Sequence, residues 1–347
     1  MQEFIKTYKL DLSLKDTNIL KGVALLLLLL HHLFFIQNGL YDDIQLYENH
    51  FLVNELGKFG KLCVAIFVFL SGYGLTVQAN KSHEIKLGEF YKKRFTKLYL
   101  NYWFIWIIFV PIGILFYHRT FEIVYATHIW EKLIIDIAGL SFAFGFYGYN
   151  ATWWFYSCII VLYLLFPFLY RLLGKYNMIL ILLGLGVYLL NLFVLRSINQ
   201  YLISFILGMI VANGIKFKFT IPQLNYNNKW TLLFVLIFAC CIRNFLGRYA
   251  ILWDSFICLI GVLLYKQIRL CGIINCTLEF IGKHSMNIFL FHTFIYAYYF
   301  ESFIYSSRNP ILIYLLLLGI CLVLSFLIEK LKKYIGFNQL QKIFYGR

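Results

Sequence analysis

Lys21-Gly-Val-Ala-Leu-Leu-Leu-Leu-Leu-Leu-His31-His32 is the stretch of sequence that decides the fold of this chain. Six consecutive leucines, with no charge between Lys21 and the histidines, predict an α-helix in lipid, because the backbone there must satisfy its own hydrogen bonds. Lys21 and His32 are eleven residues apart, so on a helix they lie about 16 Å apart along the axis and roughly 20° apart around it. The cation and the imidazole therefore share one face. A histidine inside an apolar span indicates a functional site.

The composition extends this interpretation to the whole chain. Of its 347 residues 61% are hydrophobic and 14% are charged, and the mean hydropathy is +0.75, which is typical of an integral membrane protein and not of a soluble domain. No long polar block interrupts the apolar segments, so we expect one transmembrane domain over residues 1–347, with short cytoplasmic tails at 1–19 and 329–347. The N-terminus lacks a small-residue cleavage site, which predicts that the first span is retained.

The hydropathy pattern predicts an all-α, polytopic bundle of about ten transmembrane helices, each near the roughly 20 residues that a bilayer requires. The predicted spans are residues 20–37, 59–79, 98–117, 152–170, 177–195, 200–215, 230–246, 250–267, 284–300 and 310–328. Residues 118–150 are too short and too polar for two more spans, so we expect an interfacial or re-entrant segment on the outer face.

The basic residues predict the orientation. Assigning alternate loops to opposite sides places 23 of the 31 Lys and Arg residues on one side. By the positive-inside rule that side is the cytoplasm, and both termini lie there, in a multi-pass protein of the cell (plasma) membrane. The net charge of +15 does not indicate nucleic-acid binding, because the basic residues are dispersed between apolar spans.

Two groups of polar or reactive side chains are assigned structural roles. The eight cysteines show no paired metal-ligand spacing, so we expect buried, apolar thiols and no metal. Arg243, Arg248 and Asp254 flank the tight turn between the seventh and eighth spans, where we expect them to pair near the outer surface.

Histidines in the spans are the first functional candidates. One interpretation of His32 is a histidine near the end of its span that is hydrogen-bonded to water or to a backbone carbonyl. The face that it shares with Lys21 favours the other interpretation, a functional residue. His31 points about 100° away from His32 and is a candidate supporting residue. Ile281-Gly-Lys-His284-Ser-Met-Asn-Ile-Phe-Leu-Phe-His292 places a second imidazole, His292, inside the ninth span, either as a hydrogen-bonded core residue or as a contact of a substrate.

A basic cluster precedes the third span, in Tyr91-Lys-Lys93-Arg94-Phe-Thr-Lys97. In isolation this pattern is typical of a positive-inside anchor attracted to anionic lipid. Arg94 and Lys97, at positions i and i+3, share a helical face and could together hold a phosphorylated ligand.

The second span contains Phe67-Val-Phe-Leu-Ser71-Gly72-Tyr73-Gly74-Leu75. Small residues here favour close helix packing over a catalytic role for Ser71. The sequence contains no Gly-x-Ser-x-Gly motif, which argues against a hydrolase. Trp153 at the start of the fourth span fits an aromatic belt at the membrane interface, and together with residues 142–149 it is a candidate contact for an acceptor.

The order of these motifs resembles that of the membrane-bound acyltransferase 3 family, over about residues 17–328. The resemblance rests on these elements: Lys21-x10-His32, Phe67 to Leu75, Arg94-x-x-Lys97, Thr152-Trp-Trp-Phe-Tyr156 leading to Tyr163 and Pro167, Phe205-Ile-Leu-Gly208-Met, and Gly282-Lys-His-Ser to His292. Members of the family transfer acyl groups, most often acetyl, from cytoplasmic acyl-CoA to extracytoplasmic sugars. The soluble esterase-like domain fused to some members has no counterpart in this sequence.

The resemblance implies roles for individual residues. Lys21 and His32 match the essential basic-x10-His pair of the family, and Arg94 with Lys97 matches its Arg-x-x-Arg motif. Lysine at position 97 replaces the second arginine, which removes a planar, bidentate phosphate contact at that position. Tyr73 stands where the family usually has phenylalanine, and Met286 replaces a common tyrosine.

Together these observations predict a bacterial membrane O-acyltransferase that moves an acyl group, with acetyl expected, from acyl-CoA to a hydroxyl of a surface or capsular polysaccharide. Lys21, Lys93, Arg94 and Lys97 would hold the coenzyme A phosphates. His32 would act as a general base, since an imidazole takes up protons near neutral pH, or would carry the acyl group itself. His31, Ser71, Trp153 and His292 are candidate acceptor or supporting residues.

Two alternatives from other classes stay open at this stage. The first is a transporter or flippase of a glycan intermediate that uses His32 and His292 as proton-relay or substrate contacts. The absence of a clear internal repeat and the cytoplasmic cation cluster argue against it. The second is a non-catalytic membrane subunit of a glycan synthesis complex.

Overall fold

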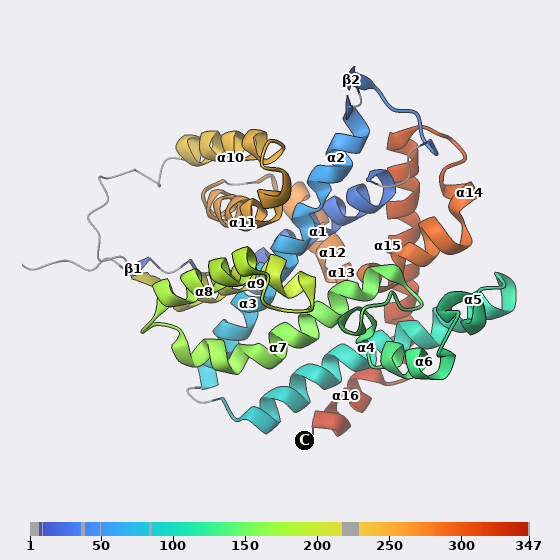
Figure 1. The fold of residues 1–347 in the computed structure, drawn as a ribbon, viewed down its shortest axis with the longest axis horizontal. Coiled ribbons are helices and arrows are strands. Elements are labelled where there is room, and N and C mark those ends of the chain that lie inside the picture. The colour runs from blue at the N-terminus through green and yellow to red at the C-terminus, as the bar shows by residue number, and fades with distance from the viewer. Residues whose placement is uncertain are drawn as a thin grey trace, which may run out of the picture. The chain divides into compact units, whose positions relative to one another are not determined.

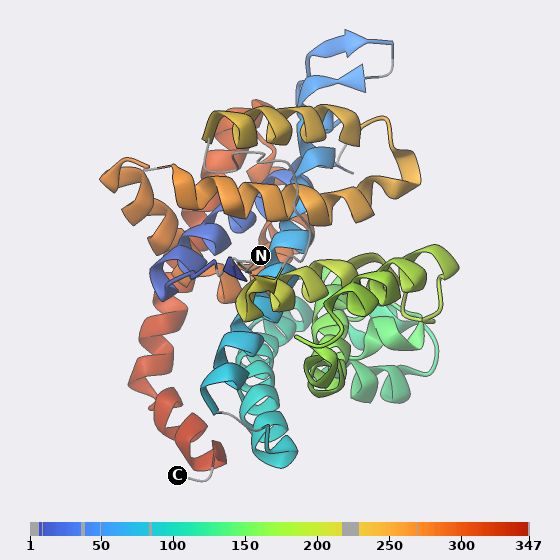
Figure 2. The same ribbon diagram turned by 90° about the vertical axis from the view of Figure 1, so that its left-hand side faces the viewer.

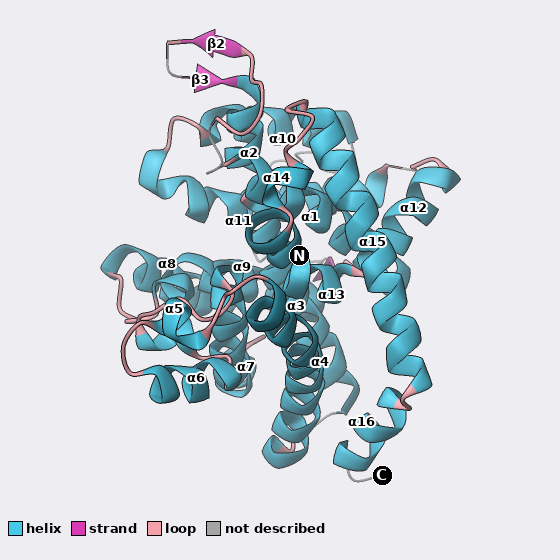
Figure 3. Ribbon diagram, turned by 90° about the vertical axis from the view of Figure 1, so that its right-hand side faces the viewer, coloured by secondary structure: helices cyan, strands magenta, loops and turns pink. Residues whose placement is uncertain are grey.

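The computed structural model describes residues 7–8, 10–35, 39–48, 50–82, 85–216, 229–268 and 270–345. These residues are mainly helical, and strands form only short pairs within them (Figure 3). They group into two compact units that are interleaved along the chain. The first unit comprises residues 1–24, 62–85 and 164–280, and the second comprises residues 25–61, 86–163 and 281–347. The single domain over residues 1–347 stays a prediction.

Three helices contribute residues to both units: α1 (Leu14–Phe34), α7 (Trp154–Leu172) and α12 (Gly272–Lys283). The first unit also contains β1 (Thr7–Tyr8), α3 (Leu62–Ser82), α8 (Asn177–Leu190), α9 (Arg196–Asn213), β4 (Ile215–Lys216), α10 (Lys229–Arg243), η3 (Gly247–Tyr249) and α11 (Ala250–Gln267). The second unit also contains β2 (Gln45–Tyr47), β3 (His50–Phe51), α2 (Leu52–Gly60), α4 (Leu87–Phe116), α5 (Phe121–Tyr125), α6 (Ile129–Ile137), η1 (Ser141–Phe144), η2 (Ala151–Trp153), α13 (Ser285–Thr293), the π-helix η4 (Phe294–Tyr299), α14 (Glu301–Ile304), α15 (Pro310–Tyr334) and α16 (Phe337–Tyr345).

Each of the ten predicted spans overlaps a described helix, but not all of these helices are long and apolar enough to cross a bilayer. Within the described ranges six stretches meet both criteria: Leu14–Phe34, Leu52–Ser82, Leu87–Phe116, Ala151–Leu172, Ala250–Gln267 and Pro310–Tyr334. Asn177–Leu190 is a shorter apolar helix. The ninth predicted span divides into the nine residues of α13 and the six of η4. The all-α membrane architecture is thus supported, whereas ten spans and cytoplasmic termini stay predictions.

In the first unit, α3 and α9 contact each other through their backbones (Figure 1). A Cβ atom at Gly72 of α3 would overlap the backbone carbonyl of Phe205, and one at Gly208 of α9 would overlap the carbonyl of Phe69. Glycine at both positions allows this approach because it has no Cβ atom. The motifs at residues 67–75 and 205–209, which are far apart in the sequence, therefore form one packing contact.

Helices α10 and α11 of the first unit lie side by side (Figure 2) and are joined by a buried ion pair. Arg243 Nε lies 2.5 Å from Asp254 Oδ1, and Arg243 Nη2 lies 3.0 Å from Asp254 Oδ2. This bidentate geometry is the favourable one for arginine and a carboxylate. The predicted pairing of Arg243 with Asp254 is confirmed, and the side chain of Arg248 lies outside the described residues.

In the second unit, residues 118–150 form α5, α6 and η1, which fold around the buried carboxyl group of Asp136. Asp136 accepts hydrogen bonds from the Tyr125 hydroxyl at 2.7 Å, the Ser141 hydroxyl at 2.6 Å and the Tyr149 backbone N–H at 2.6 Å. Burial raises the pKa of Asp136 above its ordinary value, although these hydrogen bonds oppose the shift. A Cβ atom at Gly148 would overlap Asp136 Oδ1, so the absence of a side chain at this position makes room for the carboxylate. The segment forms no long apolar helix, in line with its exclusion from the predicted spans.

Candidate active site

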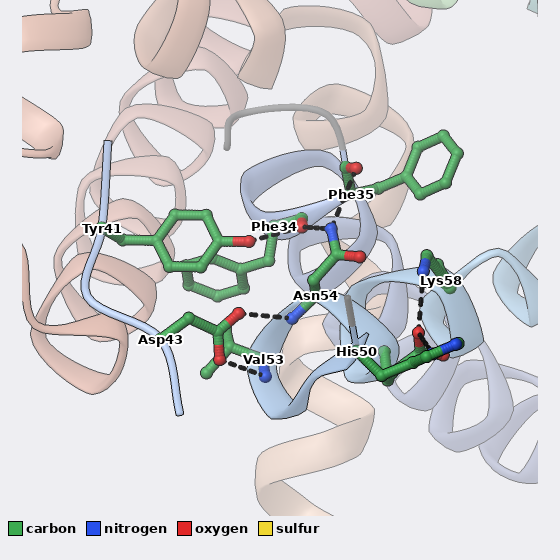
Figure 4. Close-up of polar contacts among 9 residues, drawn as sticks. Phe34, Phe35, Tyr41, Asp43, His50, Val53, Asn54 and Lys58 are labelled. Carbon is green, nitrogen blue, oxygen red and sulfur yellow. Dashed lines mark hydrogen bonds and ion pairs between the residues drawn. The ribbon is translucent and has the colours of Figure 1, made fainter. Parts of the chain in front are cut away.

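The C-terminal end of α1, which carries His31 and His32, is held by side chains that hydrogen-bond its last carbonyl groups. Carbonyls in the last turn of a helix have no partner within the helix. The Tyr41 hydroxyl donates to the carbonyl of Phe34 at 2.8 Å, and the Asn54 amide donates to the same carbonyl at 2.9 Å (Figure 4). The Tyr305 hydroxyl donates to the carbonyl of Leu33 at 2.9 Å. These bonds fix the position of the helix end immediately after the two histidines.

Helix α2 is anchored against this helix end. Asp43 accepts hydrogen bonds from the backbone N–H groups of Val53 at 2.8 Å and Asn54 at 3.0 Å, and thus satisfies the first turn of α2 (Figure 4). A Cβ atom at Gly60 would lie 2.5 Å from the carbonyl oxygen of Leu27, so the α2 backbone packs directly on α1.

His31 makes contacts that hold α1 against α2. Its Nδ1 lies 2.8 Å from the carbonyl oxygen of Gly57 on α2, so this nitrogen donates the hydrogen bond. The His31 ring also stacks on Phe35, with 4.8 Å between the ring centroids. Through these contacts His31 packs α1 against α2. The sequence signal for this contact is Gly57, a glycine that allows the two helices to approach closely.

The His32 ring faces a different set of neighbours. Its centroid lies 4.9 Å from that of His292 on α13 and 6.2 Å from that of Tyr296 on η4. His292 and Tyr296 stack on each other, with 5.9 Å between centroids and 21° between ring planes. The structure therefore brings the two predicted intramembrane imidazoles together, and it adds Tyr296, which the sequence analysis did not identify.

His292 is completely buried and is held in one orientation. Its Nδ1 lies 2.9 Å from the carbonyl oxygen of Ile288 and 3.0 Å from that of Phe289. Its Nε2 has no hydrogen-bond partner within the described part of the chain. A buried polar atom without a partner is uncommon and calls for an explanation.

Helix α13 is positioned by the turn at residues 150–153. The Trp153 indole N–H donates to the carbonyl of Leu290 at 2.9 Å, and the Asn150 amide donates to the same carbonyl at 3.3 Å. The hydroxyl groups of Thr152 and Thr293 lie 2.9 Å apart. Trp153 is 3% exposed, so its contacts are those of a buried support for α13. Its contact with an acceptor stays a prediction.

The predicted donor-binding residues lie on two helices. Arg94 is half-buried, with its guanidinium group 5.9 Å from the centroid of the Phe90 ring, while Lys93 and Lys97 are exposed. All three are on α4, and Arg94 and Lys97 are one turn apart. Lys21 lies on the continuous helix α1 that also carries His32.

Ser71, the other candidate, donates from its hydroxyl to the carbonyl of Phe67 at 2.9 Å within α3. This bond satisfies the hydroxyl locally and agrees with a packing role. For metal ions, the described residues contain no group of three or more His, Cys, Asp or Glu side chains placed to hold one.

The sequence analysis missed a second polar cluster, which surrounds the buried amino group of Lys332 on α15. Lys332 Nζ donates to Asn101 Oδ1 and Asn287 Oδ1, both at 2.7 Å, and to Glu329 Oε1 at 3.1 Å. The Asn287 amide donates to Ser325 at 3.1 Å and to Glu329 at 2.8 Å. His284 Nδ1 lies 2.8 Å from the Ser325 hydroxyl. Polar residues inside apolar helices, Asn101 and Asn287 among them, are the signal that could have identified it.

Comparison with known proteins supports the family suggested by the motifs. A family model described as an acyltransferase domain, of the acyltransferase 3 type, matches residues 14–330. Curated proteins and solved structures give no significant match to this chain. The matched region contains Lys21, the cations of α4, His32 and His292, and all six apolar helices except the last residues of α15. The chain therefore belongs to the acyltransferase 3 family and is a multi-pass, all-α membrane acyltransferase.

Proposed function

We propose that this membrane acyltransferase transfers an acetyl group from cytoplasmic acetyl-CoA to a hydroxyl of an extracytoplasmic surface polysaccharide, with His32 as the general base. The observation that carries the proposal is the environment of His32. Its imidazole lies beside His292 and Tyr296, at the end of a helix whose last carbonyls are fixed by other side chains. The match to the acyltransferase 3 family supports the reaction class.

The cations support the donor side of the proposal. Lys21 begins the uncharged stretch of α1 that ends at the histidines, about 16 Å from His32 along the helix axis. On α4, Lys93 and Lys97 provide point charges and Arg94 provides a planar guanidinium, and both kinds of group suit the phosphates of coenzyme A. In this proposal the phosphates stay at the cytoplasmic side, and the pantetheine arm carries the thioester toward His32.

The chemical step balances without a metal or a redox partner. The acceptor hydroxyl oxygen attacks the thioester carbonyl carbon while His32 takes the hydroxyl proton. The carbon–sulfur bond then breaks, and the protonated imidazole returns the proton to the departing thiolate, which leaves as free coenzyme A. The products are the acetyl ester and the thiol. An acyl-histidine route would place the acetyl group on His32 before the acceptor attacks.

The test uses the full chain in proteoliposomes, with acetyl-CoA carrying a labelled acetyl group and the surface polysaccharide extracted from the cells that make this protein. We expect label on the polysaccharide, and we expect His32→Ala to reduce transfer by at least about 100-fold, since general acid–base groups contribute that much or more. His31→Asn is the matched control, because asparagine keeps a donor near the position of Nδ1. It should retain transfer when activity is expressed per folded molecule.

Each outcome has a defined meaning. Undiminished transfer by His32→Ala would overturn the role of His32. Movement of the polysaccharide across the bilayer without label would favour the transporter, and neither label nor movement would favour a non-catalytic subunit. A reaction quenched before the polysaccharide is added separates the two routes of transfer, because only the acyl-histidine route leaves label on the peptide that contains His32.

A further inference from the structure

We propose that His292 is the positioning residue of His32: its buried Nε2, which makes no hydrogen bond in the structure, accepts one from the adjacent His32 ring in the reactive complex and so leaves the opposite nitrogen of His32 free to take the acceptor proton. This inference rests on the proposed function and adds to it a second imidazole with a defined protonation. It is carried by the hydrogen bonds of His292 and by the position of the His32 ring.

The contacts of His292 determine which of its nitrogens carries the proton. Nδ1 faces the carbonyl oxygens of Ile288 and Phe289, and carbonyl oxygens only accept hydrogen bonds. Nδ1 must therefore carry the hydrogen. A neutral imidazole has one donor and one acceptor nitrogen, so Nε2 presents a lone pair. The backbone of α13 thus makes His292 a fixed acceptor.

The lone pair of His292 needs a donor, because Nε2 is buried and has no partner within the described residues. The His32 ring is a direct neighbour, 4.9 Å away between centroids and tilted by 52°. Tyr296 is a second neighbour, with its ring nearly parallel to that of His292 and 5.9 Å between the ring centroids. His31 uses its Nδ1 for Gly57. The His32 ring lies nearer to His292 than the Tyr296 ring does and is the donor in our proposal.

An N–H group of His32 held by His292 has two consequences for the proposed reaction. It selects one tautomer of His32, so the nitrogen that faces the acceptor hydroxyl carries the lone pair that a general base needs. It also stabilises the imidazolium form that exists between uptake of the hydroxyl proton and its return to the thiolate. No additional proton is consumed, since His292 keeps its own hydrogen on Nδ1 throughout.

The surroundings of His292 support a precise position. Residues on both sides of it, Leu290 and Thr293, are held by Trp153 and Thr152. Directly after Thr293 the helix changes to the π-helix η4, a form that occurs frequently at functional sites. A residue that only fills space would not need anchors on both sides, whereas a residue that orients a base benefits from them.

The test compares substitutions at position 292 in the proteoliposome assay with labelled acetyl-CoA and extracted polysaccharide. His292→Phe keeps a ring and removes both nitrogens, and we expect kcat to fall about 10- to 100-fold, as when the partner that orients a functional imidazole is removed. His292→Gln places an amide oxygen near the position of Nε2 and should restore most of the lost kcat. In both variants KM for acetyl-CoA should stay within about twofold of the wild type, since only the chemical step is affected.

A matched control distinguishes orientation from packing. His284→Gln alters the other histidine associated with α13, which bonds Ser325, and should leave kcat unchanged per folded molecule. The inference is overturned if His292→Gln is as inactive as His292→Phe, or if KM rises while kcat holds.

Failure of this inference is separable from failure of the proposed function. If the wild-type protein labels the polysaccharide and His32→Ala does not, the proposed function stands whatever the variants at position 292 do. Full activity of His292→Phe in that situation would remove only the positioning role. Absence of transfer by the wild-type protein would overturn both.

Discussion

The two ends of α13 differ in whether their buried polar groups have hydrogen-bond partners. Near its first turn, Asn287 and the adjoining His284 belong to the Lys332 cluster, in which the amino group of Lys332 has three acceptors. Near its last turn, His292 leaves Nε2 without a partner in the described part of the chain. Both regions are buried in the same unit, and they are separated by about one turn of helix.

This difference separates structural polar groups from functional ones. A buried network whose donors and acceptors are all paired makes a structure rigid and specific, and a substrate has nothing left to bind. An unpaired acceptor costs free energy, so its persistence in a buried site indicates that another group uses it. The contrast therefore predicts that one end of α13 governs stability and the other governs rate.

The largest effect on stability should come from Lys332→Met. Loss of the amino group leaves the Oδ1 atoms of Asn101 and Asn287 without a donor and removes the ion pair with Glu329. Because Glu329 is half exposed, we expect a loss of about 3 kcal/mol in the free energy of unfolding, and not the full cost of breaking a buried pair. Thermal or denaturant unfolding in detergent micelles measures it.

Lys333→Met is the matched control for this variant, because Lys333 is its exposed neighbour on α15. It should leave the unfolding curve unchanged. The kcat of folded Lys332→Met should equal that of the wild type. A large fall in kcat with unchanged stability would break the contrast between the two ends of α13.

A smaller effect, dependent on pH, is expected at Asp136, a third buried group with several donors. Burial raises its pKa in the folded state, so the folded protein binds the proton more tightly than the unfolded chain. Its contribution to stability is therefore fully present below the unfolded pKa and is lost as the pH rises through the folded pKa. The slope cannot exceed about 1.4 kcal/mol per pH unit for one proton.

The pH effect is measured as a difference between two proteins. Unfolding of the wild type and of Asp136→Asn is followed at several pH values between 4 and 7, so that other titrating groups cancel. We expect the wild type to gain stability relative to the variant as the pH falls. If the difference in stability between the two proteins is constant with pH, Asp136 is ionised over the whole range. Its hydrogen-bond donors would then stabilise the carboxylate enough to cancel the effect of burial.

The smallest effect should come from Tyr305→Phe, which removes one hydrogen bond at the end of α1. The carbonyl of Leu33 lies in the last turn and loses the Tyr305 hydroxyl, so we expect a cost of about 1 kcal/mol. In Tyr314→Phe, the matched control, the carbonyl of Leu26 is inside the helix and keeps its intrahelical bond, so the cost should be smaller. Equal costs in an unfolding experiment would contradict this account of how the His32 end of α1 is held.

The sequence predicted the local features of the candidate site better than its contacts. The eleven-residue spacing of Lys21 and His32 depends only on helix geometry, and α1 is one continuous helix over both. His292 was recognisable because an imidazole in an apolar segment is uncommon. That it lies against His32 depends on tertiary packing between residues 260 positions apart, for which the sequence has no periodic signal.

The polar clusters show the same limit. Asn101 and Lys332 bond across 231 positions of sequence, and neither has a neighbour that indicates the other. The hydropathy pattern located the ninth apolar segment, but it did not predict that this segment is divided into α13 and a π-helix. Backbone irregularities of this kind arise from packing and hydrogen bonding that a sliding average does not contain.

The reciprocal contact of Gly72 and Gly208 has a consequence for how this family can diverge. Each glycine admits the backbone of the other helix, so a side chain at either position forces the same two helices apart. Once one has changed and the helices have separated, the second position loses most of its constraint. We therefore expect substitutions at the two positions to be correlated among related sequences, with alanine or serine at both positions or at neither.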